Sequence, residues 1–397
     1  MRIGAYYTHY QCLGHTTRIL SILSLLKKTF SRSRFFCLQG SLPQDFLSYP
    51  AFLQRYNLPF SLFSRNNFSN PFVADSRTIE KRAASCLNMV KRCRLDVLLT
   101  EYFPLGRADC WAELFPSLVH LKKQGKGIFS SVGYPLINQK QLARVRFLIP
   151  FYRKIYIHSP EIERDYMASF YPVGRRRQDY LDFFKENESR ILFTGYVLPE
   201  PLEFKKDFDE HVRFPQGPVR VLVTRGAGAY CPEIILSALQ ASDILGPGFF
   251  FVLVAGPSTT DEEWRTFQKV LTAKRVQNAL LVRATADFEA LIRQSDVCVC
   301  PAPYNTSVLL LKHRKRAVIV PFEGNARVKF VEQCARANLL QDHLGSIVVA
   351  AARLTPRRLA TAIKQRSERS VPRLVPPQWL NGREAFVKDF REMVSAG

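Results

Sequence analysis

The segment Asp287–Ala337, DFEALIRQSDVCVCPAPYNTSVLLLKHRKRAVIVPFEGNARVKFVEQCARA, decides the fold class. It predicts a helix, an apolar strand ending in a proline-flanked turn, a helix opening at Asn305-Thr306, a second apolar strand, and a loop leading into a helix with Glu332-Gln333. Two buried parallel strands that each feed a helix N-terminus are typical of phosphate-binding sites, because unpaired backbone N–H groups and the helix dipole favour negative charge there. The segment therefore indicates a nucleotide-type ligand.

Apolar strand patterns alternate with helical patterns along the whole chain. In the first half, we expect strands at Arg2–Tyr7, Phe35–Gln39, Asp96–Glu101, Gly127–Val132, Lys154–His158 and Ile191–Gly195, and helices near His15–Lys28, Thr78–Lys91, Cys110–Gln124 and Pro160–Tyr171. In the second half, the strands are Val219–Thr224, Phe249–Ala255, Ala279–Arg283, Asp296–Cys300 and Ala317–Pro321, and the helices lie near Pro232–Ala241, Asp261–Ala273, Phe288–Gln294, Thr306–His313 and Val328–Ala337. This alternation implies right-handed βαβ units and parallel sheets.

The polar, proline-bearing segment Leu198–Gly217 separates the two series and is typical of an interdomain linker. We therefore predict an N-terminal domain over residues 1–198 and a C-terminal domain over 199–375. A last segment, 376–397, carries a helix at Glu384–Ser395 that we expect to return to the N-terminal domain. The predicted fold class is α/β, with two Rossmann-like, doubly wound parallel-sheet domains that face one cleft, a geometry suited to joining two substrates.

The composition is that of a globular protein. The chain has 397 residues, of which 47% are hydrophobic and 23% charged, enough for two domains and unlike a disordered chain. Its nine cysteines form no Cys-x-x-Cys pair, which argues against a zinc site or a disulfide framework and fits a reducing cytosol. No signal-peptide-like apolar run and no stretch of about 18 apolar residues occurs. We expect a cytoplasmic protein without a membrane span.

The net charge of +23 bears on which partners the protein binds and not on its fold. Basic clusters include Lys27-Lys28, Arg175-Arg176-Arg177, Lys312-His313-Arg314-Lys315-Arg316 and Arg357-Arg358. Nucleic acid, an anionic membrane surface, a polyanionic small molecule or simply solvated surface would each explain them. No zinc-finger, RNP or helix-turn-helix signature occurs, so sequence-specific nucleic-acid binding is not expected.

An ordered set of motifs resembles one family of enzymes. The set comprises Cys12-Leu13-Gly14-His15-Thr16-Thr17-Arg18, Thr100-Glu101-Tyr102-Phe103-Pro104-Leu105-Gly106-Arg107 followed by Glu113-Leu114, Thr224-Arg225-Gly226-Ala227-Gly228-Ala229, Pro303-Tyr304-Asn305-Thr306, Pro321-Phe322-Glu323 and Glu332-Gln333-x-x-Arg336-Ala337. In this order, over essentially the whole chain, they resemble the GT-B glycosyltransferases of the MurG-like, family 28 type. Within that type the chain is most similar to a bacterial group described as predicted glycosyltransferases.

The resemblance implies an inverting, metal-independent transfer of a sugar from a nucleotide-diphosphate sugar, of uridine type, to an acceptor hydroxyl. It implies no cofactor and no metal, and the chain has no Asp-x-Asp motif. MurG-like enzymes act at the cytosolic membrane face, so an acceptor that is lipid-linked or polyanionic is expected. Peripheral attachment to anionic lipid would use Arg144, Arg146, Phe147, Phe151, Arg153 and Lys154, unless these residues only cover an ordinary helix and strand.

The first motif places Gly14 and His15 at a helix N-terminus, where backbone N–H groups approach an anion closely. His15 is the candidate general base on the acceptor hydroxyl, or a cation near the diphosphate, or merely a helix cap. Arg18 pairs with phosphate or is a solvated helix residue. Glu101, at the end of a strand, is a second acid/base candidate or a partner of Arg107.

The donor side is expected at two helix starts in the C-terminal half. Gly226, Gly228 and Ala229 follow a strand and precede a helix, the context of a phosphate-cradling loop. Asn305 and Thr306 either cap their helix or bind the diphosphate at the same end.

The last motif carries the sugar-reading candidates. The resemblance implies that Glu332 binds two vicinal hydroxyl groups and that Gln333 binds the sugar. Alternatively, both residues lie on an exposed helix face. These residues stand on the helix predicted to face the cleft.

Three departures from the family pattern bear on activity. Pro303 replaces a glycine and removes an N–H, Leu309 stands where a glutamate holds the donor ribose, and Thr224-Arg225 replaces glycines. Two further readings therefore stay open. One is a nucleotide-sugar epimerase, which needs additional carboxylates in the cleft, and the other is a catalytically inactive GT-B ligand-binding protein.

Overall fold

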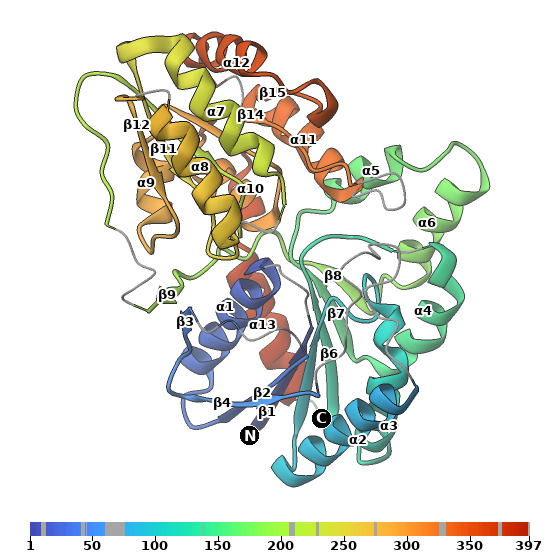
Figure 1. The fold of residues 1–397 in the computed structure, drawn as a ribbon. Coiled ribbons are helices and arrows are strands. Elements are labelled where there is room, and N and C mark those ends of the chain that lie inside the picture. The colour runs from blue at the N-terminus through green and yellow to red at the C-terminus, as the bar shows by residue number, and fades with distance from the viewer. Residues whose placement is uncertain are drawn as a thin grey trace.

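The computed structural model describes residues 1–8, 13–40, 44, 46–59, 76–137, 139–205, 211–227, 230–273, 276–324, 331–371 and 375–395. These residues form two α/β domains, each built on its own parallel sheet (Figure 1). The N-terminal sheet has seven strands in the order β4-β2-β1-β5-β6-β7-β8, and the C-terminal sheet has six in the order β12-β11-β10-β13-β14-β15. The predicted fold class is confirmed.

The N-terminal domain contains most of the first half of the chain. Its strands are β1 (Arg2–Tyr7), β2 (Arg34–Gln39), β4 (Leu53–Asn57), β5 (Val97–Glu101), β6 (Gly127–Val132), β7 (Lys154–Ile157) and β8 (Ile191–Phe193), and its helices are α1 (Leu13–Thr29), α2 (Ser76–Cys93), α3 (Trp111–Lys123), α4 (Leu142–Leu148), α5 (Ile162–Ser169) and α6 (Arg175–Glu186). The short strands β3 (Leu47–Ser48) and β9 (Glu203–Phe204) pair antiparallel beside it.

The C-terminal domain repeats the scheme. Its strands are β10 (Val219–Thr224), β11 (Phe249–Val254), β12 (Ala279–Val282), β13 (Val297–Cys300), β14 (Arg316–Ile319) and β15 (Ile347–Val348), and its helices are α7 (Pro232–Leu245), α8 (Asp261–Ala273), α9 (Phe288–Gln294), α10 (Tyr304–Lys312), α11 (Val331–Leu344) and α12 (Pro356–Glu368). The chain order crosses between β10 and β13, so the ligand crevice of a doubly wound sheet lies at their carboxyl ends.

Each sheet is buried on both faces, which explains its nearly continuous apolar strands. On the N-terminal sheet, side chains of α1 pack on one face and those of α2, α3, α4 and α6 on the other. On the C-terminal sheet, α7, α8 and α12 cover one face and α9, α10 and α11 the other. The free cysteines of strands, such as Cys298 and Cys300, belong to this core.

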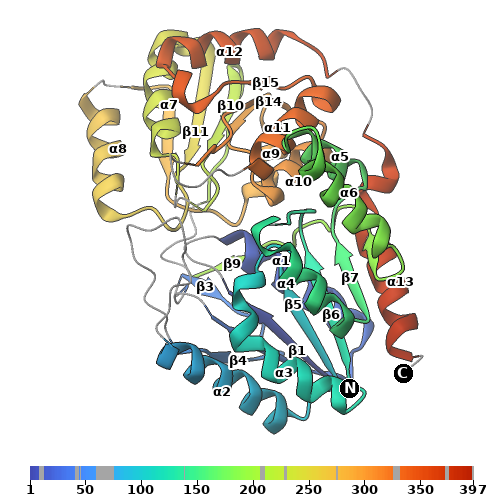
Figure 2. The same ribbon diagram turned by 90° about the vertical axis from the view of Figure 1, so that its right-hand side faces the viewer.

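The last helix, α13 (Gly382–Ser395), lies against the N-terminal domain although it follows the C-terminal domain in sequence (Figure 2). Phe386 and Phe390 contact the ring of Tyr156 at 4.8 and 6.3 Å, and the Tyr156 hydroxyl donates to Asp389 at 2.8 Å. Burial of these rings holds α13 on the sheet.

The chain passes between the domains twice, and the two passages are hydrogen-bonded to each other. The Tyr196 N–H donates to Trp379 O at 2.5 Å, and the Gly382 N–H donates to Tyr196 O at 3.2 Å. A Cβ at Gly382 would lie 2.3 Å from Gly195 O. Glycine is therefore required where the two passages cross.

Several elements were not expected from the sequence. They are β4, α4, α6, α12 and the short strands β3, β9 and β15. The missed helix α6 begins at Arg175, the first residue of the basic cluster Arg175-Arg176-Arg177. Its helical spacing buries Tyr180, Phe183 and Phe184. Among the described residues, no helix is both long and apolar enough to cross a membrane.

Candidate functional site

A cavity of about 190 Å³ lies between the two domains, beside the crevice expected from the strand order. Its N-terminal wall comes from the first turn of α1 and from the segment between β8 and β9, and its C-terminal wall from the loops after β10, β12 and β13. The lining residues are Leu13, Gly14, Thr17, Pro199, Glu200, Pro201, Leu202, Phe204, Gly226, Ala227, Val254, Pro257, Ala284, Thr285, Ala286, Phe288, Glu289, Pro303, Tyr304, Asn305, Thr306 and Leu309. Gly14, Gly226, Asn305 and Thr306 were all predicted from the sequence to bind the donor.

Two helices begin at this cavity, α1 from one domain and α10 from the other. The first residue of α10 is Tyr304, and its N-cap, Pro303, makes no side-chain hydrogen bond. Asn305 and Thr306 therefore stand inside the first turn, and the interpretation of them as caps was wrong. The uncapped N–H groups of that turn and the two helix dipoles favour an anion in the cavity.

The loop after β10 is held by side chains. Gly226 has a φ of +74°, and its N–H donates to Thr224 Oγ1 at 3.0 Å. Arg225 is buried and donates to Ala255 O at 2.9 Å and to Glu263 Oε2 at 2.8 Å. The Thr224-Arg225 pair, which replaces glycines of the family pattern, thus anchors the loop. Gly228 and Ala229 lie outside the described residues.

His15 forms the centre of a charged network on the N-terminal side. Its Nδ1 lies 2.8 Å from Glu101 Oε2, and Arg107 Nη2 donates to its Nε2 at 3.4 Å. Because the carboxylate can only accept, Nδ1 carries the proton and Nε2 keeps the lone pair. The ring therefore does not cap α1. Leu13, Gly14 and Thr17, which belong to the same first turn, line the cavity.

The network sets the ionisation of both groups. Burial lowers the pKa of His15 below its usual value, and Arg107 and Arg18 act in the same direction, while Glu101 opposes them. Burial would raise the pKa of Glu101, but His15 and Arg18 outweigh it and lower that pKa. At neutral pH the pair is therefore a neutral imidazole on an ionised carboxylate. This state suits a base with an orienting partner, so Glu101 is poorly placed to be a second proton donor.

Arg18 is buried, with 4% of its side chain exposed, so the interpretation of a solvated helix arginine was wrong. Its Nε donates to Glu101 Oε1 at 3.1 Å, and its guanidinium lies 5.0 Å from the centre of the Tyr102 ring and 4.7 Å from that of Tyr304. A Cβ at Gly133 would lie 1.8 Å from Arg18 Nη1. Arg18 thus joins the base network to the start of α10. Arg107 also lowers the pKa of Glu101, in accord with the partnership left open by the sequence, although His15 and Arg18 act more strongly.

Glu332 and Gln333 begin α11 and are both half-buried, so the exposed-face interpretation was wrong. Gln333 Oε1 accepts from the Phe322 N–H at 3.0 Å, which ties α11 to the residues that follow β14. Burial raises the pKa of Glu332, while Arg336 lowers it. Neither residue lines the interdomain cavity.

Several contributors to the cavity were not predicted from the sequence. The loop after β12 supplies Ala284, Thr285 and Ala286, and two carboxylates, Glu200 and Glu289, lie in the wall. The apolar strand at Ala279–Val282 was the available signal, since loops at carboxyl ends of parallel strands bind ligands. In the described part of the chain, no three His, Cys, Asp or Glu side chains gather closely enough to hold a metal ion.

Comparison with known proteins identifies the architecture. No protein-family model matches the chain, and no curated protein matches it. Among solved structures, MurG of Acinetobacter baumannii superimposes with a TM-score of 0.54 at 12% identity, over 99% of this chain and 100% of that one. The chain has the GT-B fold.

Other GT-B proteins superimpose equally well. The UDP-GlcNAc 2-epimerase of Neisseria meningitidis, solved bound to UDP-GlcNAc, has a TM-score of 0.60 at 11% identity, covering 99% of this chain and 100% of that one. A UDP-glucosyltransferase from Polygonum tinctorium has a TM-score of 0.61 at 10% identity, covering 99% and 98%. Superpositions at identities this low show the fold alone, so the chemistry must be argued from the residues of the site.

Proposed function

We propose that this GT-B protein is a glycosyltransferase that moves a sugar from a nucleotide-diphosphate sugar to an acceptor hydroxyl. The observation that carries the proposal is the His15–Glu101 pair, which lies at the start of α1 directly beside the interdomain cavity. A neutral histidine held by a buried carboxylate is the usual form of a general base.

The donor would bind at the C-terminal wall, around Gly226, Asn305 and Thr306. The diphosphate would meet the first turn of α10, and the nucleoside would extend toward the loop after β12. A cavity of about 190 Å³ is smaller than the roughly 300–1,000 Å³ of most small-molecule sites. A whole nucleotide sugar would therefore extend beyond the cavity or bind to a form with the domains further apart.

The chemistry proposed is a single displacement. His15 Nε2 takes the proton of the acceptor hydroxyl, the acceptor oxygen forms a bond to the anomeric carbon, and the bond from that carbon to the diphosphate breaks with inversion. The negative charge that develops on the diphosphate would be stabilised by backbone N–H groups at the starts of α10 and α1. We propose that this step is metal-independent.

The finer assignment is a MurG-like enzyme that uses a uridine nucleotide sugar. The N-terminal domain carries an aromatic patch of Trp111, Phe115, Phe147 and Phe151, with 37% of Trp111 and 56% of Phe147 exposed. Arg144 lies over the Trp111 ring at 5.4 Å. A basic and aromatic surface supports attachment to an anionic membrane and a lipid-linked acceptor.

The decisive experiment is a thermal-shift screen of nucleoside diphosphates and nucleotide sugars, followed by product analysis with the best donor. We expect uridine diphosphate to raise the melting temperature, because a ligand that binds only the folded state stabilises it. Slow cleavage of the donor, which releases the nucleotide diphosphate from the sugar, should then depend on His15. If no nucleotide raised the melting temperature, the donor assignment would be overturned.

A nucleotide-sugar 2-epimerase is the second candidate. It requires carboxylates in the cleft, and Glu200 and Glu289 meet that condition. Both are already ion-paired, Glu200 with Arg383 at 2.6 Å and Glu289 with Lys312 at 2.6 Å. Formation of the 2-epimer from UDP-GlcNAc without any acceptor would favour this reaction over transfer.

A further inference from the structure

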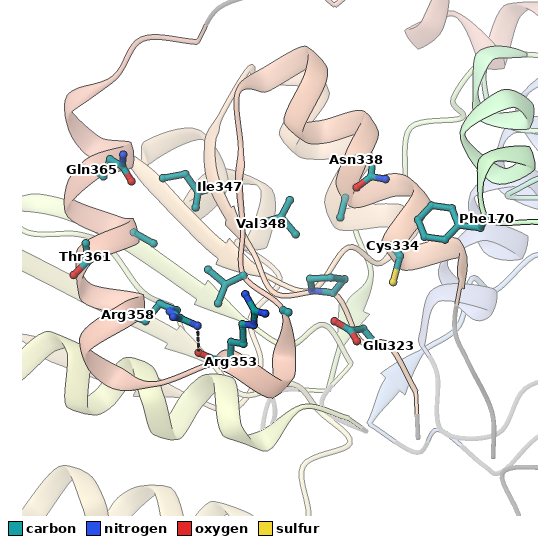
Figure 3. Close-up of a pocket in the computed structure, with 15 residues that line it drawn as sticks. Phe170, Glu323, Cys334, Asn338, Ile347, Val348, Arg353, Arg358, Thr361 and Gln365 are labelled. Carbon is teal, nitrogen blue, oxygen red and sulfur yellow. Dashed lines mark hydrogen bonds between the residues drawn. The ribbon is translucent and has the colours of Figure 1, made fainter. Parts of the chain in front are cut away.

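A second cavity, of about 720 Å³, opens in the C-terminal domain between α11, β15 and α12 (Figure 3). It shares no lining residue with the interdomain cavity. The lining residues are Phe170, Pro321, Glu323, Cys334, Ala337, Asn338, Ile347, Val348, Val349, Ala350, Arg353, Arg358, Thr361, Ala362 and Gln365. Its volume lies within the roughly 300–1,000 Å³ range of small-molecule sites.

The cavity stands where α/β folds bind ligands. Pro321 follows the carboxyl end of β14, and Val349 and Ala350 follow that of β15. Ligands of open parallel sheets bind outside these strand ends. Phe170, which is 36% exposed at the end of α5, closes the cavity from the N-terminal domain.

One side of the cavity is cationic. Arg353 and Arg358 are exposed, and Arg358 Nη1 donates to the backbone oxygen of Arg353 at 3.2 Å, which fixes the Arg358 side chain against the turn that carries Arg353 (Figure 3). Among the described residues, neither guanidinium forms an ion pair with a carboxylate. Arg358 also stands in the first turn of α12, whose dipole adds positive potential. Paired guanidinium groups bind phosphate through forked hydrogen bonds.

The remaining surface suits a hydroxylated body rather than a purely apolar one. Glu323 lies across the cavity from the arginines (Figure 3), and its carboxylate accepts hydrogen bonds from hydroxyl groups. Asn338 and Gln365 add amide donors and acceptors, and the floor of Ile347 and Val348 is apolar. A sugar ring presents hydroxyl edges and an apolar face at once.

We infer that this cavity binds a phosphorylated carbohydrate, with the phosphate on Arg353 and Arg358 and sugar hydroxyls on Glu323 and Asn338. The site is separate from the donor site and does not depend on the proposed transfer. The phosphosugar would be either free in solution or the phosphosugar part of a larger substrate, which the arms of the test distinguish.

The test is calorimetric titration of the full chain at low salt with glucose 6-phosphate, glucose, inorganic phosphate and uridine diphosphate. We expect glucose 6-phosphate to bind and glucose to fail. The double variant Arg353→Ala/Arg358→Ala should weaken glucose 6-phosphate binding at least about 10-fold, since two charge-assisted contacts are lost. Arg357→Ala, which removes an equal charge from an exposed neighbour on α12 outside the cavity, should leave that affinity unchanged.

Other binding results would contradict parts of this proposal. Equal affinity for inorganic phosphate and glucose 6-phosphate would overturn the carbohydrate assignment, and Glu323→Gln, which replaces the carboxylate, should weaken only the sugar ester. Unchanged binding of glucose 6-phosphate by the double variant would overturn the site. Loss of uridine diphosphate binding in that variant would assign the cavity to a nucleotide sugar instead, whereas absence of such binding in every variant would count against the proposed function alone.

Discussion

The two walls of the interdomain cavity are built from different chemistry. The N-terminal wall leads to a buried network of ionisable side chains, in which Glu101 is fully enclosed and holds both His15 and Arg18. The C-terminal wall offers mainly small residues and helix N–H groups, and Leu309 stands where a carboxylate was expected. Since a proton acceptor needs a tuned side chain and a diphosphate needs only oriented N–H groups, the first wall suits chemistry and the second suits binding.

The network on the N-terminal side is costly to build, which supports a functional reading of it. A buried carboxylate is tolerated only when cations and hydrogen bonds compensate for lost hydration. Glu101 has two such partners, contributed by α1 of its own domain, and the stacking of Arg18 on Tyr304 links them to the other domain. Variants on each side test this difference between the walls.

The largest effect is expected for His15→Ala. Loss of a general base should reduce turnover by about 10²-fold or more, while the affinity for the donor should change little because His15 does not line the cavity. Steady-state rates and calorimetric donor affinity measure the two separately. His120→Ala, on α3, is the matched control. A His15→Ala enzyme with the wild-type rate would remove the network from the mechanism.

The pH profile tests Glu101. His15 must be neutral to act, and its lowered pKa places the acid limb of the rate below pH about 6.5. Glu101→Gln removes the carboxylate that raises the pKa of His15, so the acid limb should move to still lower pH and the rate should fall by about 10-fold or more. An unshifted limb would show that Glu101 has no influence on the base.

The next effect concerns the binding wall. Gly226→Val places a β-branched side chain at a φ of +74°, a strain of about 1–3 kcal/mol that should distort the loop and weaken donor binding about 10-fold. Turnover at saturating donor should change less than in His15→Ala. Gly248→Ala, whose added methyl meets no atom within 4 Å, is the control for calorimetry of uridine diphosphate. Gly228→Val, at a position outside the described residues, should block the backbone N–H groups that face the anion and abolish binding.

A smaller effect is expected at the aromatic patch. Of the residues proposed from the sequence for membrane contact, Phe147 and Phe151 belong to this patch and Arg144 lies over its Trp111 ring, whereas Arg146 pairs with Glu186 at 3.1 Å. Arg153 donates to backbone oxygens at Gly125 and Met393, and Lys154 donates to Ser189 O.

Loss of one basic residue costs roughly 1 kcal/mol of attraction to anionic lipid, so Arg144→Ser should reduce vesicle binding about 5-fold. Phe147→Ser should act in the same direction, and Ile244→Ser, equally exposed on α7, should not. Sedimentation with anionic and neutral vesicles at low and high salt measures the effect. Equal, negligible binding to both vesicles would favour a soluble acceptor.

The last prediction concerns stability alone, at the place where the two domains meet. Glu163 of α5 is buried, accepts from the Tyr196 hydroxyl at 2.5 Å, and faces Arg336 of α11. Burial raises its pKa to about 7, against the opposing effect of Arg336. The folded state therefore binds the proton more tightly than the unfolded state, whose pKa is about 4.3. The resulting stability is complete below that value and is lost as the pH rises through about 7.

Glu163→Gln removes this titration. Between pH 6 and 8 the wild type should lose about 1.4 kcal/mol relative to the variant, or about 2–4 °C in melting temperature. Burial lowers the pKa of His158 to about 3, so protonation of His158 at acidic pH destabilises both proteins equally. This contribution cancels in the difference between their melting temperatures. A difference between the two melting temperatures that is independent of pH would show that Glu163 does not titrate in this range.

The layout of the two domains follows from the order of apolar and helical segments along the chain. Apolar runs such as Val297–Cys300 identified buried strands, their alternation with helices identified two parallel sheets, and the loops after β10 and β13 located the cavity wall at Gly226, Asn305 and Thr306. These features are local, because a strand or an amphipathic helix records in its own residues which face is buried.

The partners of the polar groups, in contrast, are evident only in the folded protein. His15 and Glu101 are 86 residues apart, and nothing near either one names the other. Arg18 is buried and Gln333 is bonded to the backbone of Phe322, although their spacing equally fits exposed helix positions. The physical reason is that the ionisation and role of a polar side chain depend on burial and on neighbours supplied by other elements, which emerge only when the sheets and the two domains have packed.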